Sequence, residues 1–332
     1  MSLLGYVLMV MTVSFKHITK IIPIIGLALF GYIIYDIGIE KILFSFSAIS
    51  WYYYIISLLV FLPKLLLSTF KWRYICNIQR IPTALSQLLQ LFLIGLFFGS
   101  VTPGGIGLHL RIYYLKQQSK VTFEKCLTNS IIDGTLNLLA GVFLAFLGSL
   151  FLFSKFPSFL PIILIFFIIY FIAFLFFMEK KRGSTFFNFI IKPFIPKRYK
   201  ENLDDSLDLM YEDLPTLSQT ILPFILEIAI WIIAATQVFI LAQSYDLTIP
   251  YIEFVLISII SVVVANMIPI SIGGLGVREG VFVVLLGSYG VAYEIAFVLS
   301  LAGFLVKTLI PGLIGLLLSM ATGHRYSLHN EI

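Results

Sequence analysis

The sequence predicts an all-α polytopic transmembrane protein, built as an inverted repeat with two re-entrant hairpins of broken helices. Three observations lead to this prediction. Hydrophobic residues make up 60% of the chain and charged residues 12%, whereas soluble domains carry about 25% charged residues. The apolar residues fall into long runs. A glycine-rich motif occurs twice, at residues 102–111 and 269–280, which are matching places in the two halves of the chain.

The apolar runs supply the predicted membrane segments. They lie at about 21–39, 50–70, 86–101, 125–153, 158–178, 218–244, 251–269, 280–290 and 294–318. A full transmembrane helix needs about 20 residues. The runs 86–101 and 280–290 are too short for this, and each borders a copy of the glycine-rich motif.

Charged residues between the runs predict the topology through the positive-inside rule. Lys16 and Lys20 precede the first run, and His324 and Arg325 follow the last one. We therefore expect a multi-pass protein of the cell membrane with both termini in the cytoplasm. The strongest basic signal lies after the run 158–178 and consists of Lys180, Lys181, Arg182, Lys192, Lys197, Arg198 and Lys200.

The two short runs are expected to form hairpins rather than full spans. If 86–101 crossed completely, the basic residues after it would lie outside, against the positive-inside rule. These residues are Arg111, Lys116, Lys120 and Lys125. The second hairpin, 251–269 with 277–290, is predicted from run length and from the repeat. Three spans separate the hairpins, so they enter from opposite faces, as in inverted-repeat transporters.

These features divide the chain into five segments. They are an N-terminal cytoplasmic or interfacial segment (1–20), a first membrane half (21–178), a cytoplasmic linker (179–217), a second membrane half (218–320) and a cytoplasmic tail (321–332). Apolar residues at helical spacing in the linker predict an amphipathic helix on the membrane surface. These are Leu203, Leu207, Met210, Tyr211 and Leu214.

The doubled motif holds the main candidates for substrate binding. Glycine lets the backbone turn sharply and approach a ligand closely, the helix that follows offers free N–H groups to an anion, and arginine binds phosphate with two parallel hydrogen bonds. The candidates are Gly104, Gly105, Gly107, Arg111, Gly273, Gly274, Gly276, Arg278 and Glu279. The structural alternative is tight helix packing by the glycines and a buried Arg–Glu brace.

Polar residues inside other runs are further candidates. Lys71 and Arg73 either anchor a helix at the interface or capture a lipid headgroup. Lys64 is expected to snorkel to the cytoplasmic edge. Asp133 and Glu227 are candidates for proton or cation coupling, or for partners of the arginines.

Three more residues lie close to these features. Asn266 precedes the second motif and is expected to cap a helix or line a cavity. Lys307 lies within the last run and is expected to meet a carboxylate. His109, inside the first motif, is better explained as a satisfied residue than as a titrating group.

Several classes of function are excluded. Cys76 and Cys126 imply no disulfide framework, and no cluster of metal ligands is visible, so we expect no cofactor and no metal. Neither glycine motif follows a strand or precedes Gly-Lys-Ser/Thr, which argues against a nucleotide-binding loop. The net charge of +5 fits cytoplasmic loops beside anionic lipids rather than nucleic-acid binding.

The motifs resemble those of the lysylphosphatidylglycerol synthase/flippase membrane-domain family. The resemblance lies in Lys71-Trp72, in a Thr-Pro-Gly-Gly motif that ends in Arg111, and in Pro-x-Ser-x-Gly-Gly-Leu-Gly-x-Arg-Glu-Gly at 269–280, and it extends over about residues 20–320. Family members usually carry a glutamate directly after the first glycines. Leu108 stands there in this chain, so a role for that acid is not carried over.

The resemblance implies a lipid-handling membrane domain. Members fused to a soluble aminoacyl-transferase domain make an aminoacylated phospholipid and move it between leaflets. No such soluble domain is visible in this sequence, so transfer of lysine from tRNA is not expected of it.

We expect a flippase or transporter that moves an anionic phospholipid or a polyprenyl-phosphate-linked lipid by alternating access, with Arg111 and Arg278 on the phosphate. Two alternatives stay open. One is an intramembrane enzyme of lipid or lipid-linked glycan metabolism, although no clustered nucleophile is visible. The other is a scaffold for such enzymes. The expected partner is a membrane lipid, and lipid-pathway enzymes or a second copy of the chain are the candidate protein partners.

Overall fold

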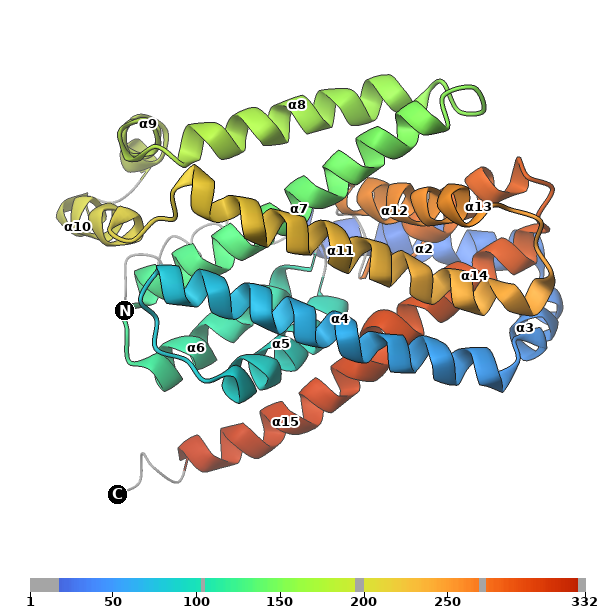
Figure 1. Ribbon diagram of the computed structural model, residues 1–332, viewed down its shortest axis with the longest axis horizontal. Coiled ribbons are helices and arrows are strands. Elements are labelled where there is room, and N and C mark those ends of the chain that lie inside the picture. The colour runs from blue at the N-terminus through green and yellow to red at the C-terminus, as the bar shows by residue number, and fades with distance from the viewer. Residues whose placement is uncertain (1–17, 103–104, 195–199, 269–272, 328–332) are drawn as a thin grey trace.

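The computed structural model describes residues 18–102, 105–194, 200–268 and 273–327, and this part of the chain is helical without strands (Figure 1). The helices are α2 (Ile18–Ile37), α3 (Ile39–Ala48), α4 (Trp51–Ile78), α5 (Leu85–Ser100), α6 (Arg111–Ser119), α7 (Phe123–Phe151), α8 (Phe159–Phe177), α9 (Lys180–Phe186), α10 (Lys200–Tyr211), α11 (Leu217–Ala242), α12 (Tyr251–Met267), α13 (Val277–Gly287), α14 (Tyr293–Phe304) and α15 (Ile310–Ser327). The 3₁₀ turn η1 (Ile106–Leu110) precedes α6, and the π-helical turn η6 (Leu305–Leu309) joins α14 to α15.

Five of the described helical segments are long and apolar enough to cross a membrane. They are Trp51–Ile78, Phe123–Phe151, Phe159–Phe177, Leu217–Tyr245 and Tyr293–Ala321. Each corresponds to one of the long apolar runs of the sequence, and α2 covers most of a further run at 21–39. The predicted all-α polytopic membrane fold is therefore confirmed.

The two short helices beside the glycine motifs belong to hairpins. α5 has 16 residues and α13 has 11. At a rise of about 1.5 Å per residue, both fall short of the ~30 Å hydrocarbon core. Figure 1 shows α5 and α6 opening toward the end of the bundle that holds α10, whereas α12 and α13 open toward the opposite end, near α3.

Exposed charge differs between the two ends of the bundle. The end with α6, α9 and α10 carries exposed residues of both signs, with a basic excess: the basic Arg80, Lys116, Lys120, Lys180, Lys181 and Arg182, and the acidic Glu179, Asp205, Asp208 and Glu212. At the opposite end, Lys41 lies beside the exposed Asp36 and Glu40. That the α10 end faces the cytoplasm stays a prediction from the positive-inside rule.

The bundle is held together by small residues and by a few buried polar contacts. On α15, a Cβ at Gly315 would lie 2.0 Å from the carbonyl oxygen of Leu93, so glycine alone permits α5 to approach this closely. α4 and α11 exchange two hydrogen bonds, from Ser57 Oγ to the Gln237 carbonyl at 2.9 Å and from Gln237 Nε2 to the Ser57 carbonyl at 2.8 Å. Such contacts replace the hydrophobic driving force that is absent between helices in lipid.

The linker and the chain ends differ in detail from the prediction. The amphipathic helix α10 ends at Tyr211, so Leu214 follows it instead of belonging to it. α15 continues to Ser327, so the start of the predicted tail 321–332 is helical. Most of the predicted segment 1–20 lies outside the described residues.

Candidate functional site

The first hairpin makes its turn with glycines and one threonine. Gly105 has a φ of 69°, in the left-handed region that glycine adopts without strain. The Thr102 hydroxyl donates to the Phe98 carbonyl at 2.8 Å and accepts the Gly107 amide at 2.7 Å. A Cβ at Gly107 would lie 2.1 Å from the Phe98 carbonyl oxygen, so this glycine serves close packing. Gly104 lies outside the described residues.

The second hairpin turns through three glycines with positive φ. The angles are 59° at Gly273, 78° at Gly274 and 87° at Gly276. Gly276 is the N-cap of α13, and its amide donates to the carboxylate of Glu279 at 2.7 Å. A glutamate at this position satisfies one of the free N–H groups at the helix start. α13 therefore begins at the hairpin tip.

Arg278 is buried and firmly oriented. Its Nε donates to Glu279 Oε1 at 3.0 Å and to Ser300 Oγ at 3.1 Å, and its Nη2 donates to the same carboxylate oxygen. Nη1 donates to the Gly273 carbonyl at 3.2 Å. The guanidinium lies 4.8 Å from the centroid of the Phe304 ring. Glu279 therefore holds the guanidinium beside the turn, as expected for a buried Arg–Glu brace.

The two hairpin tips meet at a cavity of about 230 Å³, which we call the hairpin cavity. Gly105 lines it from the first hairpin, and Gly273, Gly274 and Arg278 line it from the second. A Cβ at Gly273 would lie 3.1 Å from the Ser100 carbonyl oxygen, so the backbones of the two hairpins come close together here. The two copies of the motif therefore line one shared cavity.

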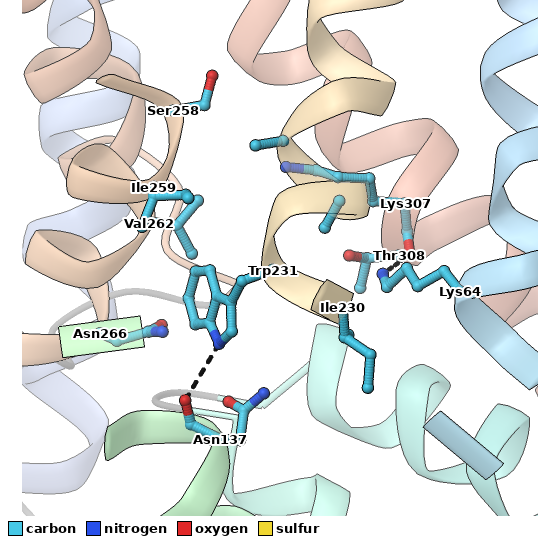
Figure 2. A pocket seen from close by; sticks show the side chains of 12 residues that line it. Lys64, Asn137, Ile230, Trp231, Ser258, Ile259, Val262, Asn266, Lys307 and Thr308 are labelled. Carbon is cyan, nitrogen blue, oxygen red and sulfur yellow. Dashed lines mark hydrogen bonds between the residues drawn. The ribbon is translucent and has the colours of Figure 1, made fainter. Parts of the chain in front are cut away.

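A second cavity of about 220 Å³ adjoins the hairpin cavity, since Val262, Asn266 and Thr308 line both. Figure 2 shows Lys64 of α4 and Lys307 of η6 among its lining side chains. We call it the lysine cavity. Lys64 Nζ donates to the Lys307 carbonyl at 3.5 Å. Neither lysine forms a salt bridge with a described residue.

An ion-pair network borders the lysine cavity. Asp133 contacts two buried cations, Lys71 at 2.7 Å and Arg111 at 2.5 Å. Lys71 also reaches Glu227 at 3.0 Å, and Glu227 accepts the side-chain amide of Asn137 at 2.6 Å. Asn137 lines the lysine cavity. The network therefore connects α4, α6, α7 and α11 to the wall of that cavity.

Arg111 has a different environment from Arg278. Its guanidinium lies 4.2 Å from the centroid of the Trp72 ring, and Trp72 donates to Asn129 at 2.7 Å. Nε and Nη1 of Arg111 are buried without a hydrogen-bond partner among the described residues. Among the residues that line the hairpin cavity, Arg278 is present and Arg111 is absent.

Comparison with known proteins identifies the family. The family described as the transmembrane region of lysylphosphatidylglycerol synthase matches residues 19–315, most of the chain. The chain belongs to this family. A UPF0104 membrane protein of Methanothermobacter thermautotrophicus is 20% identical over 336 residues, which cover 93% of this chain and 92% of the relative. The predicted resemblance is confirmed, and the protein is an integral multi-pass membrane protein.

In this member of the lysylphosphatidylglycerol synthase transmembrane-region family, Leu108 stands at the position where an acidic residue was expected. Its side chain makes an apolar contact there. A Cβ at Gly95 would lie 3.2 Å from Leu108 Cδ1, and one at Gly99 would lie 3.5 Å from Leu108 Cβ. The leucine side chain therefore packs against the glycine face of α5. The neighbouring His109 is satisfied by Ser130 Oγ, 2.8 Å from its Nδ1.

Three lysines have surroundings that differ from those predicted from the sequence. Lys71 is 3% exposed and belongs to the ion-pair network, so the interface-anchor interpretation is wrong. The prediction that Lys64 snorkels to the cytoplasmic edge is wrong as well. α4 packs against η6 at this level, and the Lys64 side chain lines the lysine cavity instead. Lys307 meets no described carboxylate within salt-bridge distance. Arg73 is half-buried and forms no salt bridge with a described residue.

Some lining residues escaped the sequence analysis. Ser300, Phe304 and Thr308 all contact Arg278 or line the hairpin cavity. They follow each other every four residues in the last apolar run, which places them on one helix face. The two hydroxyl residues at this spacing were a usable signal. Asn266 was predicted to line a cavity, and it does.

Proposed function

We propose that the protein moves an anionic lipid between the leaflets of the membrane, with the phosphate bound in the hairpin cavity and the two halves exposing it alternately. Family membership points to a role with membrane lipids. The observation that carries the proposal is the meeting of both glycine turns at one cavity with a buried arginine in its wall. The substrate class is an anionic phospholipid or a polyprenyl-phosphate-linked lipid.

The chemistry of this cavity suits a phosphate. Gly273 and Gly274 present backbone without side chains to the cavity, and α13 begins three residues after Gly274, at Val277. The N-terminus of a helix attracts anions through its free N–H groups and its dipole. Arg278 adds a charge that burial in the membrane would make unfavourable without a partner or a function. Glu279 neutralises part of that charge and fixes the orientation of the guanidinium group.

Arg111 is proposed to support the site from the ion-pair network. Two of its three guanidinium nitrogens have no acceptor among the described residues. Buried guanidinium groups without acceptors are costly, so a small shift of the first hairpin toward a bound phosphate would improve their hydrogen bonding. Gly105, at the tip of the same hairpin, lies on the cavity wall.

Glu227 is the better of the two carboxylates proposed for coupling. Both oxygens of Asp133 lie beside cations. Oε2 of Glu227, in contrast, is buried without a hydrogen-bond donor among the described residues. A carboxylate with one free oxygen beside a polar cavity can accept a proton there.

Arg278→Ala is expected to reduce lipid transfer in proteoliposomes at least about tenfold, because a charge-assisted hydrogen bond to phosphate contributes roughly 1.5–3 kcal/mol. Transfer would be measured with fluorescent anionic lipids quenched from one side of the vesicle. Arg182→Ala, at an exposed linker arginine, is the matched control and should transfer lipid at the wild-type rate. Full transfer by a folded Arg278→Ala protein would contradict the proposal.

Glu227→Gln is expected to remove the response of transfer to a pH gradient while leaving transfer without a gradient within about twofold. Glutamine keeps the oxygen that accepts from Asn137 and Lys71 but cannot bind a proton. The rate would be measured with and without an imposed gradient. A gradient response equal to wild type would exclude Glu227 as the coupling residue.

A further inference from the structure

The charges around the two joined cavities do not balance. Five cationic side chains line the cavities or belong to the bordering network, namely Lys64, Lys71, Arg111, Arg278 and Lys307. Three carboxylates accompany them in the described part of the chain, namely Asp133, Glu227 and Glu279. With the lysines protonated, the excess is two positive charges, and inside a membrane such an excess needs an anion.

The excess belongs to the lysine cavity. Each arginine has a carboxylate within hydrogen-bond distance, and Lys71 has two. Lys64 and Lys307 have none among the described residues. The Lys64 ammonium donates a hydrogen bond to the carbonyl of Lys307, at a long distance of 3.5 Å. A neutral carbonyl at this distance cannot replace a counter-ion.

Local helix geometry presents the lysine pair to the cavity. Lys307 lies in the middle of the π-helical turn η6, and such turns within α-helices are frequent at functional sites. Lys64 follows Pro63, a proline inside α4, and proline removes one backbone hydrogen bond of a helix. Lys307 therefore leaves a π-helical turn and Lys64 follows a proline, and Figure 2 shows the two lysines next to each other in the wall of the lysine cavity.

The lysine pair and Arg278 line two adjoining cavities. Phe304 and Thr308 line the hairpin cavity beside Arg278, and Lys307 and Thr308 line the lysine cavity. A ligand that fills both cavities would place one anionic group at Arg278 and a second at the lysines. A phosphodiester headgroup carries one negative charge, whereas a diphosphate carries two or more on adjacent phosphorus atoms.

We propose that the joined cavities form a bipartite site for a diphosphate, so that the preferred lipid carries a diphosphate rather than a single phosphodiester. This inference rests on the proposed function for its lipid, but it is tested by binding alone. The first phosphate lies at Arg278 and the glycine turn. The second lies between Lys64 and Lys307, where it supplies the charge that the described residues lack.

The test measures binding to the purified full-length protein in a neutral detergent. The probes are geranylgeranyl diphosphate, dioleoylphosphatidylglycerol and inorganic pyrophosphate. The wild type is expected to bind the prenyl diphosphate at least about tenfold more tightly than the phosphodiester lipid, since an added charge-assisted contact is worth at least that factor. Binding of the prenyl compound far above pyrophosphate identifies a lipid as the source of the diphosphate, whereas equal binding identifies the free anion.

Lys64→Met and Lys307→Met are each expected to remove the preference for the diphosphate while keeping phosphodiester binding. The control is Lys41→Met, at an exposed lysine of α3, which should keep the preference. Loss of an uncompensated cation should leave the ligand-free protein at least as heat-stable as wild type. Should either methionine variant fail to fold, Lys307→Arg keeps the charge and should keep the preference.

Two results would overturn the inference. One is equal wild-type affinity for the diphosphate and the phosphodiester lipid, and the other is an unchanged preference in folded Lys64→Met and Lys307→Met proteins. These outcomes differ from failure of the proposed function. A protein that binds diphosphate through the lysines but transfers no lipid retains the site and loses transport. One that transfers phosphodiester lipid without any diphosphate preference retains transport and loses the bipartite site.

Discussion

Asp133→Ala is expected to be the most destabilising single substitution in the ion-pair network. Asp133 is the carboxylate between Lys71 and Arg111, both nearly fully buried. Its removal leaves Arg111 without a carboxylate partner and Lys71 with Glu227 alone. Removing one partner of a buried ion pair costs about 3–5 kcal/mol. We expect the apparent melting temperature of the detergent-solubilised protein to fall by on the order of 10 °C.

An exposed ion pair provides the control for this experiment. Lys180 and Asp208 are 3.0 Å apart, with side chains that are 56% and 69% exposed. Exposed pairs contribute about 0–1 kcal/mol, so Asp208→Ala should melt within about 2 °C of wild type. Equal melting temperatures for Asp133→Ala and Asp208→Ala would show that the buried network does not hold the bundle together.

Gly107→Ala is expected to disrupt the first hairpin and abolish lipid transfer. The added Cβ would lie 2.1 Å from the Phe98 carbonyl oxygen and 2.7 Å from the Thr102 hydroxyl oxygen. Backbone atoms of α5 cannot move away without breaking the turn, so the expected cost is at least about 3 kcal/mol. Heat stability and transfer in proteoliposomes would both be measured, and both should fall.

Gly105→Ala, two residues earlier in the same turn, separates a steric clash from backbone strain. Gly105 has a positive φ, but no atom lies within 4 Å of its added Cβ. A left-handed alanine costs about 1–2 kcal/mol, so Gly105→Ala should be less destabilised than Gly107→Ala and should keep measurable transfer. A Gly107→Ala protein as stable as Gly105→Ala would contradict the packing at this turn.

Hydropathy and charge predicted the fold well because they report on transfer into lipid, which depends on local composition. The long runs became α4, α7, α8, α11 and the α14–α15 segment, and the short run before the first motif became α5. Element ends were less well predicted. Leu214 has the periodicity of α10, yet the helix ends at Tyr211, because side-chain spacing does not mark where backbone hydrogen bonding ceases.

The partners of the buried charged residues could not be predicted from the sequence. Lys71 and Glu227 are 156 residues apart and lie 3.0 Å apart in space. Lys64 was assigned to the membrane edge because a lysine near the end of an apolar run usually snorkels. Only the packing of α4 against η6 brings it to an internal cavity instead. Spacing along one helix carries no information about which face of another helix it meets.

By itself, the sequence determined the membrane fold, its family, the two hairpins and the residues of the glycine motif, because each of these depends on short stretches of chain. The tertiary structure alone decided that both motifs line one cavity, that Arg278 lies in its wall while Arg111 joins Asp133, and that Lys64 and Lys307 line the adjoining cavity without a salt bridge to a described carboxylate. These facts depend on how helices far apart in the chain pack together, and burial then turns their few charges into the chemistry of the site.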